Sequence, residues 1–219
     1  MPRIKETTVY QFDELPTEAA KNKAREWLRE GEQQDFDPEY EYYETAAKLL
    51  GITLDERKTG TTRGGKDIYQ SDIRWSGFYS PGDGASFVGR YEFAPGCAEA
   101  IRKEFPTNTA LHQIADDLTV LFARRKLLGK SGIKAKITVD DGREVHKYAM
   151  GLEWTVSGDN EDEEISGDEE KALLEAMRDF AGWIYKSLEE EWDYRLSDGQ
   201  IDESMRANEY EFDEDGDRA

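Results

Sequence analysis

The stretch that decides the fold class is IKAKITVDDGREVHKYAMGLEWTV, residues 133–156. Its first half has an apolar side chain at every second position, the pattern of a strand with one buried face: Ile133, Ala135, Ile137 and Val139. Asp-Asp-Gly at 140–142 is typical of a tight hairpin turn. A return strand over 145–156 then carries its own apolar face at Tyr148, Met150, Leu152, Trp154 and Val156. The stretch predicts an antiparallel β-hairpin.

Outside this hairpin, much of the chain shows helical periodicity. The longest helix is predicted over 168–192, with Asp168 as its cap, because apolar residues recur at steps of three and four: Leu173, Met177, Phe180, Ile184, Leu188 and Trp192. Further helices are predicted over 18–30, 38–50, 95–105, 107–128 and 201–207, and further strands over 4–12, 67–75, 86–93 and 210–212. Hairpins interleaved with helix pairs predict an α+β fold, an antiparallel or mixed sheet of hairpins with helices packed on it.

The domain organisation follows from length and continuity. The 219 residues contain no internal repeat and no long linker. This favours a single α+β domain over residues 1–197. Residues 198–219 are rich in acidic side chains and are predicted to form an acidic C-terminal appendage.

The negative charge is concentrated towards the C-terminus. The chain has a formal net charge of −20, and residues 159–217 hold 23 acidic and five basic residues, a net charge of −18. Residues 1–158 have a net charge of only −3. Such a surface repels nucleic acid and anionic membranes and attracts a basic partner, including DNA-binding proteins. We therefore expect a basic protein or nucleic-acid-binding complex as partner, and no direct contact with nucleic acid or membrane.

Most enzyme and cofactor signatures are absent from the sequence. There is no dinucleotide-binding, phosphate-loop, nucleophile-elbow or zinc-protease motif. One cysteine, Cys97, excludes an intrachain disulfide and fits a reducing compartment, and only two histidines are present. The acidic loops do not match calcium-loop spacing. We expect no enzyme activity, no cofactor and no metal site, and the start of the chain shows no signal peptide.

Two groups of residues are candidate binding sites. The first is an acidic surface made of carboxylates in the loop after the hairpin and along the long helix: Asp159, Glu161, Asp162, Glu163, Glu164, Glu189, Glu190, Glu191 and Asp193. The second is the segment WSGFYSPGDGASF, residues 75–87, whose glycines allow close backbone approach and whose aromatic rings offer stacking faces. Its ligand-binding residues would be Arg74, Trp75, Phe78, Tyr79, Asp83 and Arg90. Alternatively, this segment is a hairpin whose glycines serve the turn and whose aromatics fill the core.

Three stretches also carry a family resemblance. They are VYQFDELPTEAAKNKAREW at 9–27, WSGFYSPGDGASF at 75–87 and ANEYEFDEDG at 207–216. In this order they resemble a family of small proteins encoded by tailed bacteriophages, some of which are labelled antitoxins of toxin–antitoxin systems. The resemblance brings no catalytic residues. It implies a phage protein that acts in the cytoplasm of the host bacterium.

Charge and resemblance together lead to a first functional hypothesis and two alternatives. The first is a phage accessory protein that binds and inhibits a host defence protein, in the manner of an anti-CRISPR, through an acidic surface that mimics nucleic acid. One alternative is a small-ligand binder, or a sponge for nucleotide immune signals, that uses the Trp75–Phe87 hairpin. The other is an antitoxin-like protein. The sequence leaves the oligomeric state open.

Overall fold

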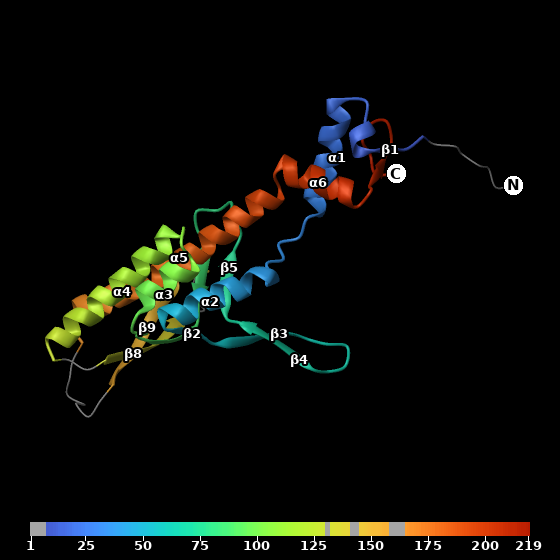
Figure 1. Ribbon diagram of the computed structural model, residues 1–219. Helices are drawn as coiled ribbons and strands as arrows, with labels where there is room; N and C mark the ends of the chain where they lie inside the picture. The colour runs from blue at the N-terminus through green and yellow to red at the C-terminus, as the bar shows by residue number, and fades with distance from the viewer. Residues whose placement is uncertain (1–7, 130–131, 141–144, 158–164) are drawn as a thin grey trace. The chain divides into compact units, whose positions relative to one another are not determined.

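The computed structural model describes residues 8–129, 132–140, 145–157 and 165–219. The chain divides into two compact units (Figure 1). Unit 1 combines the two ends of the chain, residues 1–35 and 188–219, and unit 2 is residues 36–187. In the described part of the chain, no helix is both long and apolar enough to cross a bilayer.

Unit 2 is built on a four-stranded antiparallel sheet with the order β2-β7-β8-β9. The strands are β2 (Ile52–Leu54), β7 (Gly89–Glu92), β8 (Gly132–Val139) and β9 (Met150–Ser157). The predicted hairpin is confirmed, because Ala135 pairs with Trp154 and Ile137 with Leu152. The return strand begins later than predicted, at Met150, because Lys147–Ala149 forms a 3-10 turn. Residues 141–144, which include Asp141 and Gly142 of the predicted turn, lie outside the described residues.

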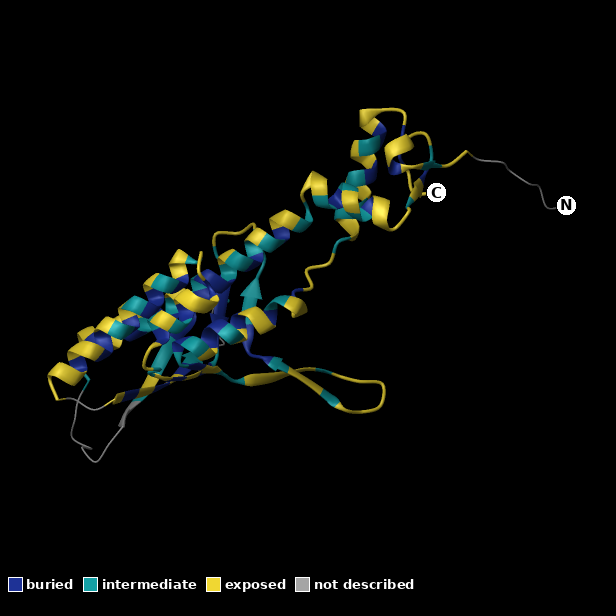
Figure 2. Ribbon diagram, viewed as in Figure 1, coloured by how far each residue is buried: buried dark blue, intermediate teal, exposed yellow. Residues whose placement is uncertain are grey.

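Helices of unit 2 cover one face of this sheet (Figures 1 and 2). This arrangement confirms the predicted α+β fold class. They are α2 (Tyr40–Leu50), α3 (Cys97–Glu104), α4 (Thr109–Leu127) and the part of α5 (Gly167–Arg195) up to residue 187. An aromatic pair joins the two layers, Tyr91 of β7 against Phe122 of α4, at 6.1 Å between ring centroids. The opposite face of the sheet carries charged side chains paired across strands, such as Lys134 with Glu92 at 3.0 Å.

Two shorter hairpins branch from the sheet. They are β3 (Glu56–Thr61) with β4 (Asp67–Ser71), and β5 (Ile73–Ser76) with β6 (Gly84–Phe87). The predicted strands 67–75 and 86–93 are therefore each two strands, which divide at Asp72 and Val88. The division has a backbone cause, a ring of three hydrogen bonds: Asp55 N–H to Val88 O, Val88 N–H to Asp72 O, and Asp72 N–H to Asp55 O, at 3.0, 3.0 and 2.7 Å.

The start of α5 corrects a second detail. The predicted cap was Asp168, but the helix begins with a capping box made by Ser166 and Glu169. The Ser166 N–H and Oγ–H donate to Glu169 Oε2 at 2.9 and 3.0 Å, and the Glu169 N–H donates back to Ser166 Oγ at 3.3 Å. Glu169 is buried, so its carboxylate serves the cap and the interior together.

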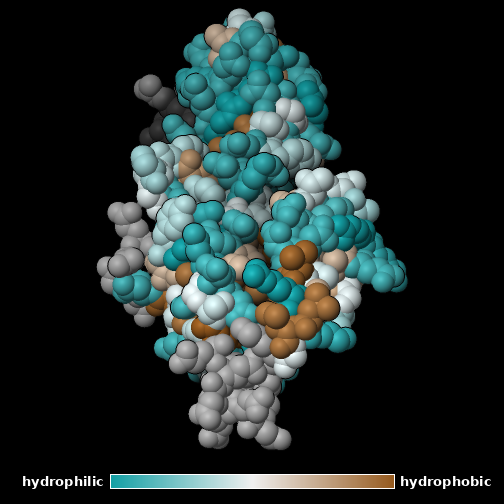
Figure 3. All heavy atoms as spheres, turned by 90° about the vertical axis from the view of Figure 1, so that its left-hand side faces the viewer, coloured by the Kyte–Doolittle hydropathy of each residue, from teal (hydrophilic) through white to brown (hydrophobic). Residues whose placement is uncertain are grey.

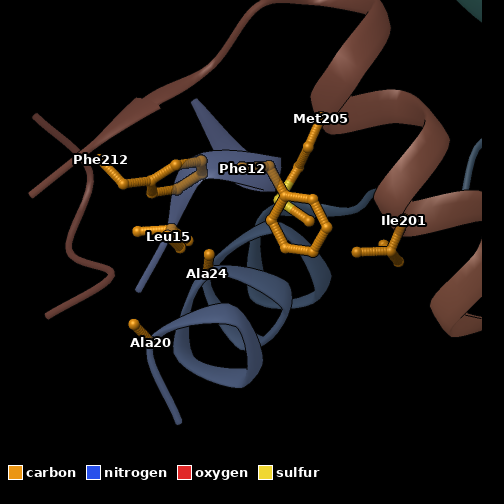
Figure 4. Packing of buried hydrophobic residues seen from close by; sticks show 7 residues of the cluster. All are labelled: Phe12, Leu15, Ala20, Ala24, Ile201, Met205 and Phe212. Carbon is orange, nitrogen blue, oxygen red and sulfur yellow. The ribbon is translucent and has the colours of Figure 1, made fainter. Parts of the chain in front are cut away.

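Unit 1 brings the two ends of the chain into one small core. It contains β1 (Tyr10–Gln11), α1 (Glu18–Gly31), the last turns of α5, α6 (Asp198–Ala207) and β10 (Glu211–Phe212). Strand β1 pairs antiparallel with β10. Figure 4 shows the core, which consists of Phe12, Leu15, Ala20, Ala24, Ile201, Met205 and Phe212. Residues 198–219, predicted as an appendage, thus pack against the N-terminal residues as part of unit 1.

Candidate functional site

The predicted acidic surface is only partly within the described residues. Its first five members, Asp159, Glu161, Asp162, Glu163 and Glu164, lie outside them.

The other four members lie on the last turns of α5, in unit 1, and do not share one side of the helix. Glu189 and Asp193 are four residues apart and share a side. Glu191 is turned from Glu189 by about 200°, at about 100° per residue. It pairs with Arg195 at 2.8 Å instead. Glu190 is exposed on a third side. The predicted residues alone therefore make no continuous acidic face.

The division into units shows where the charge is densest. Unit 1 has 21 acidic and nine basic residues, a net charge of −12 in 67 residues. Unit 2 has 28 acidic and 20 basic residues, a net charge of −8 in 152 residues. The N-terminal helix α1 therefore belongs to the most acidic part of the molecule, although the charge count along the sequence assigned it to a nearly neutral body.

The basic residues of unit 1 are used to hold the unit together. Arg25 donates two hydrogen bonds to Asp202, at 2.7 and 2.9 Å, which join α1 to α6. It also donates to Glu18 at 2.8 Å, and these carboxylates raise the pKa of the guanidinium, Asp202 most. Arg206 binds Asp13 on the surface, and this hydrogen bond lowers the pKa of the Asp13 carboxyl. Such pairing stabilises the fold and leaves little positive charge for the remaining carboxylates.

Seven of the other acidic side chains of unit 1 make up a set that we call the carboxylate surface. In the part of unit 1 that the structure describes, they have no ion-pair partner: Glu26, Glu30, Glu189, Asp193, Glu203, Glu214 and Asp215. Glu26 and Glu30 are exposed neighbours one turn apart on α1. Like charges at this spacing destabilise a helix by about 0.2–0.5 kcal/mol. Fold stability therefore does not explain them, which makes them candidates for binding.

The C-terminal loop of unit 1 is fixed in place. Asp213 Oδ1 accepts the N–H groups of Asp215 and Asp217, at 3.0 and 2.9 Å. Gly216 has a φ of 86°, and a Cβ at this position would lie 2.2 Å from Ala20 O on α1. Lys23 on α1 pairs with Asp217 at 2.7 Å. The acidic side chains of this loop are thus presented from a packed segment. Across the described ranges, no three His, Cys, Asp or Glu side chains are grouped to hold a metal.

The aromatic residues of the alternative site form a stacked cluster. Trp75 and Phe78 stack with centroids 5.7 Å apart and an interplanar angle of 9°, and Phe36 meets Trp75 edge-on at 5.1 Å. Tyr185 on α5 donates its hydroxyl to Gly77 O at 3.1 Å, which ties the loop to the helix.

The polar residues of this alternative site are engaged in the loop itself or elsewhere. Asp83 Oδ2 accepts the N–H groups of Tyr79 and Ser80, at 3.0 and 2.7 Å, and closes the turn. Arg74 donates two hydrogen bonds to Asp72, and Arg90 lies on the open face of the sheet, 3.2 Å from Asp55. Tyr79 is 79% exposed. The structure thus brings Trp75, Phe78 and Asp83 together but places Arg90 apart from them.

The sequence reading missed Glu26 and Glu30 because the N- and C-terminal segments meet only in the folded protein. A usable signal was present, since two glutamates one turn apart lie on a different side of α1 from the buried Ala20 and Ala24.

A family profile described as "Domain of unknown function (DUF8835)" matches residues 36–198. The match begins at the first residue of unit 2 and ends at the first residue of α6. No curated protein and no solved structure matches the chain.

Proposed function

The chain belongs to the DUF8835 family, and from this premise we propose that it is a protein-binding inhibitor whose carboxylate surface occupies the basic groove of a partner. The partner is a host protein that binds nucleic acid, such as a bacterial defence complex. The proposal extends to a phage accessory protein acting in the host cytoplasm, as the sequence resemblance implies. The observation that carries it is the carboxylate surface, whose members have no ion-pair partner in the described part of unit 1.

Carboxylates can stand in for phosphates because both are anionic acceptors of bidentate arginine hydrogen bonds. A groove lined with arginine and lysine concentrates positive potential, and an acidic ligand is steered into it over long distances. The same complementarity excludes partners without a basic surface. Unit 1 has the net charge that this mechanism needs, −12 in 67 residues.

The internal ion pairs of unit 1 support the proposal in a second way. The links from Arg25 to Asp202 and from Lys23 to Asp217 fix α6 and the C-terminal loop to α1. Acidic side chains on these elements are therefore held on a folded scaffold before binding. Preorganisation lowers the entropy that association costs, and so more of the electrostatic attraction is available as affinity.

A capture experiment with matched charge variants tests the proposal. The first variant neutralises five members of the carboxylate surface: Glu26→Gln, Glu30→Gln, Glu203→Gln, Glu214→Gln and Asp215→Asn. The second neutralises five exposed acidic residues of unit 2: Glu41→Gln, Glu56→Gln, Glu99→Gln, Glu104→Gln and Glu170→Gln. Both carry the same net charge. The full chain and both variants are used to capture proteins from bacterial lysate at rising salt.

We expect the unchanged chain and the unit 2 variant to capture the same nucleic-acid-binding protein, and the unit 1 variant to lose it. Adding excess nucleic acid should release the captured protein, because both ligands occupy one groove. Equal capture by the two variants, or capture that nucleic acid does not reverse, would contradict the proposal. Circular dichroism of each variant controls for folding.

A further inference from the structure

A groove runs between α4 and α5 in unit 2 and encloses about 490 Å³. Its apolar lining consists of Val120 and Leu121 from α4, Leu128 directly after this helix, and Ala172 and Ala176 from α5. The two alanines lie one turn apart, and their small side chains leave the space into which a larger side chain fits. Lining residues extend from Asp117 to Leu128 along α4 and its C-terminal end, and from Asp168 to Asp179 on α5. Each span is eleven helical steps, which is about 16 Å or three helical turns.

The apolar residues beside this groove are unusually exposed. Val120 is 67% exposed, Leu128 is 62% exposed and the adjoining Leu127 is 88% exposed. Figure 3 looks at the side of the molecule where α4 and α5 lie in Figure 1, and shows brown apolar side chains gathered among hydrophilic ones. Single apolar side chains on a surface are ordinary, but a contiguous group beside a groove marks an interaction site.

The rim of the groove is acidic. Asp117, Asp168, Glu175 and Asp179 line it, against one cation, Arg124. Asp117 and Asp168 have no ion-pair partner in the described part of the chain. Glu175 pairs with a neighbour on its own helix, Arg178, at 3.1 Å, and Asp179 lies 3.8 Å from Lys147. An occupant therefore needs apolar anchors and positive flanks.

The walls of the groove are held at a fixed spacing. Arg125 on α4 donates to Glu169 on α5 at 2.9 Å. Both side chains are buried, and Glu169 is one of the residues that line the groove. The depression is therefore part of the native packing, and binding there needs no separation of the two helices.

We propose that this groove is the docking site for a basic amphipathic helix of a partner protein. Leucine-like side chains at helical spacing would fill the space over Ala172 and Ala176, and lysine or arginine residues would pair with the rim. A second copy of this chain is disfavoured by its own charge of −20. Residues 158–164 include five acidic residues, which the rim repels. The site is separate from the carboxylate surface, so the inference goes beyond the proposed function.

The test measures binding of a defined peptide to the full chain by fluorescence anisotropy. The probe is a helical peptide of roughly 18 residues, five turns, with leucines on one face and lysines on the other. A control peptide has the same composition in an order without a helical apolar face. At about 150 mM salt, where the screening length is about 8 Å, attraction to the acidic surface in general is weak for both. We expect the amphipathic peptide to bind about ten-fold tighter than the control.

Matched variants on α4 then locate the site. Val120→Lys adds a cation to the groove and should weaken binding of the amphipathic peptide about ten-fold, which is about 1.4 kcal/mol. Ala123→Lys adds the same charge at an exposed position of α4 outside the groove and should leave the affinity within about two-fold. Ala172→Trp, an exposed position on α5, should also weaken binding by filling the groove. Melting curves confirm that each variant folds.

Several results would overturn the inference. Equal binding of both peptides, or equal effects of Val120→Lys and Ala123→Lys, would show attraction by charge alone. Self-association of the unchanged chain that Val120→Lys abolishes would assign the groove to a second copy. Peptide binding that appears only after residues 158–164 are replaced by Gly and Ser would assign it to the chain's own segment. The five-residue variant of unit 1 should bind the peptide normally, which separates this inference from the proposed function.

Discussion

Arg125 and Glu169 form the ion pair that joins α4 to α5 at the groove, and Arg125 is only 1% exposed. Arg125→Met retains much of the side-chain length but leaves the Glu169 carboxylate buried without this cation. Removing one partner of a buried pair typically costs about 3–5 kcal/mol. Because the Ser166 N–H and hydroxyl still donate to the other oxygen of Glu169, at 2.9 and 3.0 Å, we expect the lower end of that range, about 3 kcal/mol.

Urea unfolding followed by far-ultraviolet circular dichroism measures this loss. With a denaturant slope of about 2 kcal/mol per molar urea, a loss of about 3 kcal/mol lowers the midpoint by about 1.5 M. The matched control is Arg102→Met, whose ion pair with Asp116 at 2.6 Å also involves α4 but lies at the surface. Because solvent screens that pair, its midpoint should stay close to that of the unchanged chain.

A double variant separates the charge from the packing. If the loss in Arg125→Met comes from an uncompensated carboxylate, adding Glu169→Met should restore most of the stability, to within about 1 kcal/mol. Two outcomes would refute this reasoning. One is a midpoint for Arg125→Met no lower than that of the Arg102→Met control. The other is a double variant less stable than Arg125→Met alone.

Three further predictions concern single sites. The Tyr91 hydroxyl is buried with no hydrogen-bond partner among the described residues, and burial raises its pKa. Tyr91→Phe should therefore leave the free energy of unfolding unchanged or raise it by up to about 1 kcal/mol, and a clear loss of stability in thermal unfolding would contradict this. Gly51 has a φ of 87°, and a Cβ there would lie 2.1 Å from Glu92 O; Gly51→Ala should cost at least about 2 kcal/mol in urea unfolding, and a smaller effect would mean that the strands can shift. Arg206→Gln should raise the pKa of Asp13 towards 3.8 in an NMR titration. A lowered carboxyl pKa stabilises the folded state above the pKa of the unfolded state, and this stabilisation is lost as the pH falls through the pKa of the folded state. Acid unfolding of unit 1 should therefore begin at higher pH in the variant, and an unchanged Asp13 titration would rule this out.

The parts of the fold that were predictable are those with a clear local period. The hairpin at 133–156 alternates apolar and polar residues, and β8 and β9 pair as that alternation requires. Strand β3 was missed because Glu56–Thr61 is polar on both faces and lies exposed in a projecting hairpin. The division of the predicted strands 67–75 and 86–93 depends on backbone hydrogen bonds among Asp55, Asp72 and Val88, which leave no periodic signal in the sequence.

The candidate sites show the same limit. The excess of acidic residues near the C-terminus was visible in the sequence. Glu26 and Glu30 join those residues only because α1 and α6 share a core, and this contact is between positions more than 170 residues apart. The groove depends on Ala172 and Ala176 facing α4. In the sequence these alanines are unremarkable members of a long helix, and only the packing of the two helices turns small side chains into a cavity.

The salt dependence of binding distinguishes the carboxylate surface from the groove between α4 and α5. Recognition by the carboxylate surface is mainly electrostatic, so it should weaken steeply as ionic strength rises. The groove buries apolar side chains, and burial of apolar surface is not screened by salt. The family match adds a second distinction, because residues 36–198 include the whole lining of the groove but neither α1 nor β10. A captured protein that elutes at moderate salt therefore points to unit 1. One that is retained at high salt and displaced by the amphipathic peptide points to the part of the chain that defines the family.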